Sequence, residues 1–546
     1  MSAAPADADL LLTGADVYTV DAARRWAGAV AVRGDRIVAV GTADELRDLV
    51  GPSTVRLHLP GRMVLPGFQD AHVHAAFGGR NLLSLNLDHL DGRQDYLDAI
   101  ATHAVAHPEL AWITGGGWSN AVFAEGGPRR EDLDAVVADR PVFLMNTDVH
   151  GAWVNTRALE AGGISAATPD PWDGYYVRDV DGSPTGTLHE GAAYSFAADV
   201  LPRTDAATWR ASLLRAQAEL HALGITGWQD AWVEPDLLSA YRALDDAGEL
   251  TVRVVASLWW DRHRGPEQID EQVALRRRGT GGRVDAGTVK IMLDGCPENG
   301  TASVLRPFEG HVGEAHGNGI AFLDAPALEE AVTRLDALGF QVHMHALGDR
   351  ALRMALDAVA SAREANGRRD ARHHIAHLQV TDPADLPRLR QLGVVATMQP
   401  YWAQLDTAMR ELTVPAVGEE RASRLYPIGT VARSGAVLAF GSDWPVSTPD
   451  PLLQMEVAVT RVSPAERDGE PFQSDERIEL PAAIAAFTRG AAYVNRDDEA
   501  GMIAPGMRAD LAVLDRNLFE GGPIGDAQVE VTIANGRVVY DRRSSG

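Results

Sequence analysis

The chain has 546 residues, a net charge of −26 and a single cysteine, Cys296. Its length exceeds what one hydrophobic core usually serves, so we expect two or three structural units. The negative charge argues against a nucleic-acid binder and against docking on anionic membranes, and a lone cysteine excludes intramolecular disulfides and cysteine-based zinc sites.

We expect no secretory signal in the N-terminal segment, because it lacks both a cationic start and a long apolar stretch. No run along the chain approaches the ~18 consecutive apolar residues of a membrane span. We therefore predict a cytoplasmic protein without a membrane partner.

Short strands joined by tight turns are predicted near both ends of the chain. Residues 9–64 have the pattern of a small sheet rather than of alternating strands and helices, and residues 510–540 repeat that pattern. We predict that the two segments, 1–64 and 503–546, pair into one β domain.

Between these ends, residues 65–502 alternate candidate buried strands with candidate helices. The strands are a first one ending near His72, followed by Gly224–Asp230, Leu250–Trp259, Gly287–Leu293, Phe340–Ala346, His374–Val380, Val394–Gln399 and Ala436–Ser442. Eight such repeats predict an α/β fold, a (β/α)₈ TIM barrel. The alternative is a doubly wound open sheet, which is disfavoured because no G-x-G-x-x-G motif follows any strand.

Residues 76–200 do not fit the repeat. They are too many for one loop after the first barrel strand. We predict an inserted subdomain there, lying over the mouth of the barrel.

Imidazole, amine and carboxylate groups recur where the predicted strands end. His72 and His74 are two residues apart, so on a strand their side chains point the same way and can chelate one divalent metal. Barrel chemistry is found at the carboxyl ends of strands. The other strand ends carry Lys290, His345, His377 and Asp443. The set as a whole predicts a metal site at one rim of the barrel.

Nine motifs follow one another over nearly the whole chain: LPGFQDAHVH, VFLMNTDVHGAWVN, GITGWQDA, VKIMLDG, VHMHALGDRA, RHHIAHLQ, MQPYW, GSDWPV and GMIAPGMRADLAVLD. In these motifs the chain resembles the amidohydrolase superfamily, and within it amidohydrolase family 3, the YtcJ-like branch that includes N-substituted formamide deformylases. The resemblance implies a TIM barrel with a β-sandwich formed by both termini.

The resemblance also implies a centre that binds one or two divalent ions, with zinc favoured. Its residues would be His72, His74, Lys290, His345, His377 and Asp443. Lys290 matches the position where relatives often carry a carboxylated lysine that bridges two metals. The alternative is a plain lysine, paired with Asp443 or Asp294, beside a single ion. The sequence Ile375-Ala376-His377 departs from the commoner Ile-Glu-His form but keeps the ligand.

The predicted function is hydrolysis of a C–N bond in a small-molecule amide or N-substituted formamide, by attack of hydroxide formed at the metal. Asp443 would move the proton to the leaving amine, and His150 would donate a hydrogen bond to the substrate oxygen. Glu190 has no settled role. The predicted substrate-binding residues are Trp118, Trp153, Asn155, Gln399 and Trp402.

Two other functions stay open. The same centre would serve a lactone or ester hydrolase, and a non-catalytic binding protein could use the same fold. A homodimer is the candidate assembly.

Overall fold

The barrel is the central unit of the computed structural model, which describes residues 7–90, 92–123, 127–310 and 316–544. The predicted β domain, barrel and insert also include residues 1–6, 91, 124–126, 311–315 and 545–546, which lie outside the described residues. Eight parallel strands follow one another in chain order, each hydrogen-bonded to the next. They are β6 (Phe68–Val73), β13 (Ile225–Val233), β14 (Arg253–Trp259), β15 (Val284–Met292), β16 (Gln341–Ala346), β17 (His374–His377), β18 (Val395–Met398) and β19 (Leu438–Phe440). This order confirms the predicted barrel and excludes the doubly wound sheet.

The barrel closes where β19 meets β6, just past the last residues of the β19 strand. The backbone N–H of Asp443 donates to the His72 carbonyl at 2.7 Å, and that of His74 donates to the Trp444 carbonyl at 2.8 Å. Gly441 is required at this seam, because a Cβ atom there would lie 2.5 Å from the backbone nitrogen of His72. The closure therefore brings the end of β6 and the loop after β19 into direct backbone contact.

Helices cover the outside of the barrel strands. The main ones are α6 (Ala206–Ala222), α7 (Pro235–Asp246), α8 (Ile269–Gly279), α10 (Ala325–Ala337), α11 (Asp349–Asn366), α12 (Leu386–Leu392), α15 (Ile428–Ser434) and α16 (Pro451–Thr460). Asp205 and Asp324 cap α6 and α10, each accepting a hydrogen bond from the backbone N–H three residues on. On α11 the buried residues Leu352, Leu356 and Val359 recur at helical spacing, so that face packs on the sheet.

Several strands end earlier than the sequence predicts. The strand predicted over His374–Val380 ends at His377, because His377 and Leu378 have φ values of 84° and 50°, which are incompatible with a strand. The strand predicted over Ala436–Ser442 is reduced to Leu438–Phe440. The polar residues after these strands thus lie on the rim loops.

Both termini contribute to one sheet of a β-sandwich domain, as predicted. Its order is β22-β21-β20-β5-β1-β2-β3, with β4 paired to β1. The strands are β1 (Leu10–Tyr18), β2 (Trp26–Arg33), β3 (Arg36–Gly41), β4 (Val55–His58), β5 (Met63–Pro66), β20 (Leu511–Leu514), β21 (Val529–Ala534) and β22 (Arg537–Asp541). Because β5 pairs with both β1 and β20, the N-terminal and C-terminal strands share a core that includes Leu12, Val17, Val513 and Val531.

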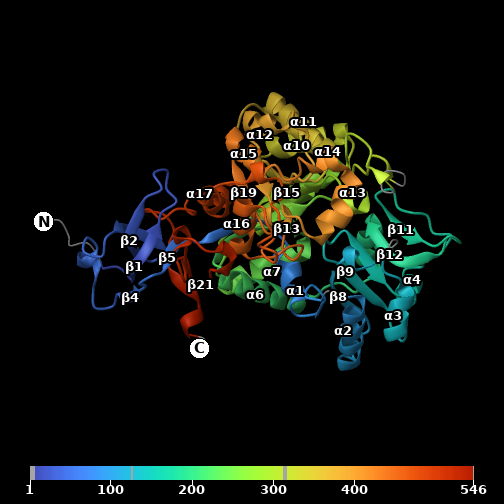
Figure 1. Cartoon of the computed structure of the whole chain (residues 1–546), viewed down its shortest axis with the longest axis horizontal. Coiled ribbons are helices and arrows are strands. Elements are labelled where there is room, and N and C mark those ends of the chain that lie inside the picture. The colour runs from blue at the N-terminus through green and yellow to red at the C-terminus, as the bar shows by residue number, and fades with distance from the viewer. Residues whose placement is uncertain (1–6, 91, 124–126, 311–315, 545–546) are drawn as a thin grey trace.

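A second sheet lies in the insert between β6 and β13. Its order is β11-β12-β10-β9-β8-β7, from β7 (Leu85–Asn86), β8 (Ile113–Trp118), β9 (Val142–Asn146), β10 (Gly151–Val154), β11 (Gly174–Arg178) and β12 (Pro184–Glu190). The insert also carries α1 (Ala75–Asn81), α2 (Arg93–Ala106), α3 (Arg130–Val136), α4 (Thr156–Ala161) and α5 (Gly191–Asp199). Figure 1 shows the sandwich and the insert at opposite ends of the molecule, with the barrel between them. The boundaries 1–64 with 503–546, 65–502 and 76–200 stay predictions.

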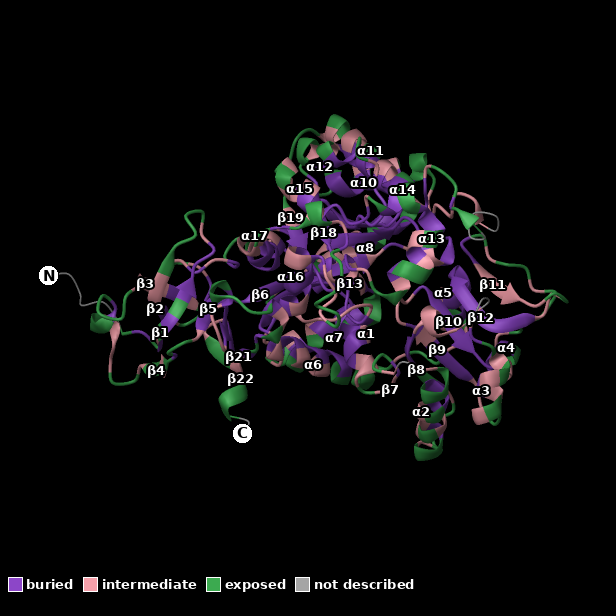
Figure 2. Ribbon diagram, viewed as in Figure 1, coloured by how far each residue is buried: buried purple, intermediate pink, exposed green. Residues whose placement is uncertain are grey.

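Burial follows this layout. Figure 2 shows buried strands at the centre of the barrel and exposed residues on outer helices such as α2. Within the described ranges, none of the helices combines the length and the apolarity that crossing a membrane requires.

Candidate metal centre

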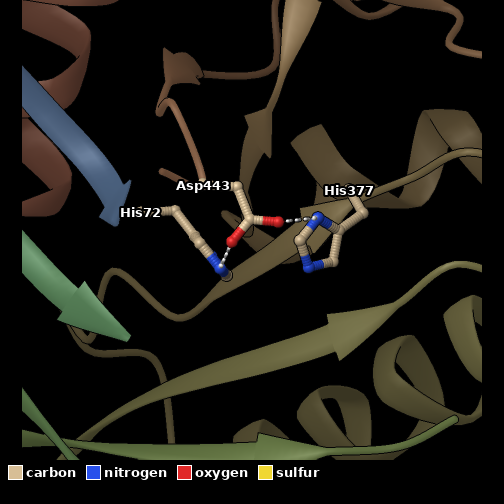
Figure 3. A group of neighbouring side chains, drawn as sticks. All are labelled: His72, His377 and Asp443. Atoms are coloured by element: carbon tan, nitrogen blue, oxygen red, sulfur yellow. Dashed lines mark ion pairs between the residues drawn. The ribbon is translucent and has the colours of Figure 1, made fainter. Parts of the chain in front are cut away.

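Two histidines and one aspartate meet at the seam of the barrel. The Nε2 atoms of His72 and His74 each lie 3.1 Å from Oδ1 of Asp443. The two histidines come from β6 and the loop that follows it, and Asp443 comes from the loop after β19. His377, at the end of β17, approaches the other oxygen of Asp443, with Nδ1 at 4.0 Å from Oδ2. Figure 3 shows Asp443 between His72 and His377.

Imidazole rings continue from this group around the rim. The ring centroids of His72 and His377 lie 4.8 Å apart, those of His377 and His345 lie 4.6 Å apart, and those of His345 and His150 lie 5.6 Å apart. The structure therefore brings His72, His74, His345, His377 and Asp443 together at the carboxyl ends of the strands, beside His150 of the insert.

The Nδ1 atom of His377 and that of His345 each have a hydrogen-bond partner. Nδ1 of His377 lies 3.0 Å from Oε1 of Gln399, and Nδ1 of His345 lies 3.1 Å from Oδ1 of Asp294. A carbonyl or carboxylate oxygen can only accept, so in both rings Nδ1 carries the proton and Nε2 has a free lone pair. Metal-binding histidines are usually held in this way.

The protonation of the group suits a divalent cation. Burial lowers the pKa of His72 to about 3 and the pKa values of His345 and His377 well below their usual range, so these rings are neutral. Burial alone would raise the pKa of Asp443, but His72, His74 and His377 outweigh it and hold that pKa well below its ordinary value. The result is a set of neutral imidazoles around one carboxylate, a ligand set that zinc prefers.

Buried polar atoms at the centre also lack partners. His72 Nε2 and Asp443 Oδ1 are buried without a hydrogen bond of acceptable geometry to any described residue. Such atoms are costly to bury unless something satisfies them. Ligand atoms on a tetrahedral zinc ion lie about 3.3 Å apart, close to the 3.1 Å that separates each Nε2 from Asp443. The residues present thus fit a bound divalent metal.

Lys290 lies on β15 among the same groups and is buried. Burial lowers the pKa of its amine to about 7, although the carboxylate of Asp443 acts in the opposite direction. Within the described part of the chain, neither Asp443 nor Asp294 lies within ion-pair distance of Lys290, and Asp294 binds His345 instead. The ion pair considered as the alternative role of Lys290 is therefore not formed.

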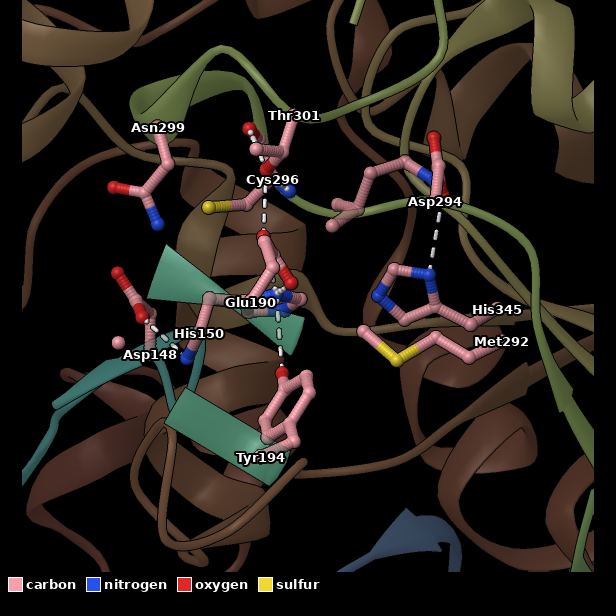
Figure 4. A network of polar contacts seen from close by, with 12 residues as sticks. Asp148, His150, Glu190, Tyr194, Met292, Asp294, Cys296, Asn299, Thr301 and His345 are labelled. Carbon is pink, nitrogen blue, oxygen red and sulfur yellow. Dashed lines mark hydrogen bonds and ion pairs between the residues drawn. The ribbon is translucent and has the colours of Figure 1, made fainter. Parts of the chain in front are cut away.

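His150 and Glu190 form a buried pair that the insert presents to the rim (Figure 4). Nδ1 of His150 lies 3.0 Å from both carboxylate oxygens of Glu190, and the Thr301 hydroxyl donates to Oε1 of Glu190 at 2.6 Å. Burial would lower the pKa of His150, but the Glu190 carboxylate raises it to about 9. His150 is therefore a cation at neutral pH whose Nε2–H is not used by Glu190.

Three residues predicted to bind substrate lie in the packed interior of the insert instead. Trp118 and Trp153 are buried against each other in its core, and their indole N–H groups donate to the backbone carbonyls of Leu144 and Arg129. Asn155 caps α4 and uses both its amide oxygen and its amide nitrogen on backbone groups of the insert. Their surroundings give these residues packing and capping roles and do not support the predicted contact with substrate.

The other two predicted pocket residues lie at the centre. Gln399 contacts His377 through its oxygen, and its amide nitrogen is buried without a partner among the described residues. The half-buried Trp402 ring stacks on His377, with centroids 5.6 Å apart and an angle of 28° between the rings. Both residues border the space next to His377.

Asp70 also lies at the centre, although it is not among the site residues predicted from the sequence. Its Oδ1 accepts hydrogen bonds from the backbone N–H groups of His72 and Ser442, both at 3.0 Å. It thereby joins β6 to the loop that carries Asp443, across the seam. Burial raises its pKa to about 7. A carboxylate within a buried strand, two residues before a candidate ligand, is the signal that would have identified it.

Comparison with known proteins agrees with this geometry. A family model described as "Amidohydrolase family" matches residues 58–540. The chain belongs to the amidohydrolase family. The predicted membership is confirmed. The match covers the sandwich strands from β5 onward, the barrel and the insert.

Three similar proteins match over nearly the full length. LONG AFTER FAR-RED 3 of Arabidopsis thaliana is 30% identical over 98% of this chain and 92% of that protein. N-substituted formamide deformylase of Arthrobacter pascens is 28% identical over 98% of this chain and 99% of that protein. The crystal structure of an uncharacterized metal-dependent hydrolase of Pyrococcus horikoshii has a TM-score of 0.74 at 24% identity, covering 95% of this chain and 99% of that one, which shows the shared fold.

Proposed function

We propose that this amidohydrolase-family chain is a metal-dependent enzyme that hydrolyses a C–N bond of a small-molecule amide or N-substituted formamide. The observation that carries the proposal is the rim group itself: neutral imidazoles with free Nε2 atoms around an ionised Asp443. The name of the Arthrobacter relative supports the formamide class.

His72, His74 and Asp443 would hold one ion, and His345 with His377 a second, with zinc the favoured metal. When bound, the metal lowers the pKa of water and polarises a carbonyl group. Lys290 would link the two ions as a carboxylated lysine. Its buried amine, with a pKa of about 7, is half neutral at that pH and increasingly neutral above it, and only a neutral amine reacts with carbon dioxide.

The chain's own residues would then perform the proton transfers. Asp443 accepts the proton released as water attacks, and delivers it to the leaving nitrogen, which must become an amine to depart. His150 faces the rim as a cation and donates through Nε2–H to the substrate oxygen as it becomes negative. Gln399 and Trp402 would border the bound substrate beside His377. A homodimer and a cytoplasmic location stay predictions.

The test is hydrolysis of a panel of N-formyl amines, N-acyl amines and aryl esters by the purified chain and by Asp443→Asn. We expect metal-dependent turnover of amides or formamides that falls by about 10²–10⁴-fold in the variant, the usual contribution of a proton-transferring group. Asp336→Asn is the matched control, because Asp336 also pairs with a histidine, His373, at 3.1 Å but outside the rim. Turnover of the esters alone would favour the lactone or ester alternative, and equal rates in wild type and Asp443→Asn would contradict the proposal.

A further inference from the structure

The barrel interior directly beneath the metal centre is polar. Side chains alternate along β16, so Gln341, His343 and His345 share its inner face, and His343 lies one layer below the rim. Interiors of such barrels are usually filled by branched apolar side chains. Here the layer contains six fully buried polar side chains: Gln229, Ser257, Gln341, His343, His374 and Thr397.

These side chains are joined to His72 by a chain of hydrogen bonds. Nε2 of His343 lies 2.8 Å from Nδ1 of His72, and Nδ1 of His343 lies 3.1 Å from Oγ of Ser257. Gln229 Nε2 lies 3.0 Å from the same Oγ and 3.1 Å from Nε2 of His374. The chain ends at Thr397, whose hydroxyl lies 2.9 Å from Nδ1 of His374.

One assignment of protons satisfies the chain and leaves His72 able to bind metal. His72 offers Nε2 to the centre, so as a neutral ring it carries its proton on Nδ1 and donates it to Nε2 of His343. His343 then carries its own proton on Nδ1 and donates it to Ser257. The two N–H groups of Gln229 donate to Ser257 and to His374, so no donor in the chain is directed against another donor.

We propose that His343 is a positioning residue that holds His72 in the tautomer and orientation required for metal binding through Nε2. This inference rests on the proposed metal centre. Ser257 acts one step further out, because it accepts from Nδ1 of His343 and thereby keeps Nε2 of His343 unprotonated. Gln229 also donates to Ser257, and the remaining three members, Gln341, His374 and Thr397, complete the layer.

A role confined to packing makes a different prediction. If the layer only filled the barrel, changing His343 would lower the free energy of unfolding and leave the affinity of the folded protein for metal unchanged. A positioning role lowers the metal affinity itself, because His72 loses the acceptor that selects its tautomer. Partners of this kind typically contribute 10–100-fold to metal affinity.

The experiment measures the dissociation constant for zinc by competition with a chelator of known affinity, on metal-free wild type and variants whose folding is checked by circular dichroism. His343→Leu removes the acceptor at similar volume, and we expect zinc to bind about 10–100-fold more weakly. His343→Gln keeps a carbonyl oxygen that can accept from His72, and we expect it to recover most of the affinity.

His221→Gln is the matched control, since His221 is buried and bonds to Ile225 and Thr251 without any link to the centre. We expect its zinc affinity to equal that of wild type. If His343→Leu does not fold, Ser257→Ala decides the question, with an expected loss of several-fold. Zinc affinity within twofold of wild type in the folded His343→Leu variant, or in Ser257→Ala, overturns the inference. Wild type that binds no zinc instead contradicts the proposed metal centre.

Discussion

At the scale of single residues, His150 adds a positive charge beside a group of neutral imidazoles. Glu190 contacts Nδ1 with both oxygens and is itself fully buried. Glu190 has a φ of 52° and a ψ of −124°, a backbone conformation rare for residues other than glycine. Gly295 leaves room for the pair, because a Cβ atom there would lie 2.2 Å from Oε1 of Glu190. Backbone strain and close packing of this kind are typical of functional sites.

Replacing His150 with glutamine tests its role as a hydrogen-bond donor. We expect kcat to fall by about 10²–10³-fold, the usual cost of losing a donor to a developing oxyanion. The pKa of His150 is raised from 6.5 to about 9, so the donor is fully charged below pH 6.5 and is lost as the pH rises through about 9. The stabilisation from its pairing with Glu190 is lost over the same range. Wild-type activity should therefore decline above pH 9, as measured by kcat/KM between pH 5 and 10.5.

The decline of kcat/KM above pH 9 tests whether His150, and no neighbouring residue, is the group that titrates. It should be missing in His150→Gln, and it should move to lower pH in Glu190→Gln, which removes the neighbouring charge and keeps the shape. An unchanged alkaline decline in His150→Gln would contradict the assignment.

Residue types at strand ends predicted which side chains meet at the rim, but the partners of those side chains were not predictable. Glu190 and Asp294 lie 40 or more residues along the chain from the histidines they contact. The first pair depends on the register of β10 against β12 in the insert, and the second on the pairing of β15 with β16 in the barrel. The tryptophans show the converse difficulty. Trp118 and Trp402 have the same side chain, and nothing in the sequence indicates that the first is core and the second lies beside His377.

At the scale of elements, the seam between β6 and β19 determines the geometry of the centre. His72 and Asp443 lie on its two sides, joined by a backbone hydrogen bond and by the side chain of Asp70. Because Gly441 lies against the backbone of His72, the two loops can approach only if residue 441 has no side chain.

Gly441→Ala should therefore destabilise the fold and disturb the centre. We expect the free energy of unfolding to fall by about 1–3 kcal/mol, the typical cost of forcing an extra carbon into a packed site. Urea unfolding monitored by tryptophan fluorescence measures the change. Gly28→Ala is the matched control, because an added Cβ at Gly28 meets nothing within 4 Å. Equal unfolding free energies for the two variants would contradict the importance of the seam.

Helices were predicted more accurately than strand ends. The sequence pattern predicts helices over Pro235–Ala247 and Ala325–Leu338, and α7 and α10 each begin at the predicted residue and end one residue earlier. Strand ends were overestimated because the apolar run of a buried strand continues into rim loops. At His377 the backbone turns away with a positive φ that the residue type does not indicate.

At the scale of the whole molecule, the site combines residues from two units. The barrel supplies the candidate metal ligands, and the insert supplies His150 and Glu190. Polar contacts join the two units around the rim: the Tyr175 hydroxyl donates to the Asn299 carbonyl at 3.1 Å, and Arg262 pairs with Asp173 at 2.6 Å. The insert therefore adds the positive charge of His150 to a group of candidate ligands that the barrel holds.

The number of metal ions bound per folded chain tests the central claim most directly. The measurement is elemental analysis of the purified protein, after removal of metal by a chelator and reloading with zinc. The arrangement of His72, His74 and Asp443 beside His345 and His377 predicts about two equivalents that the chelator removes and zinc restores, with a carboxylated Lys290 between them. About one equivalent would contradict the bridge. A folded chain that retains no divalent metal after reloading would contradict the metal centre itself.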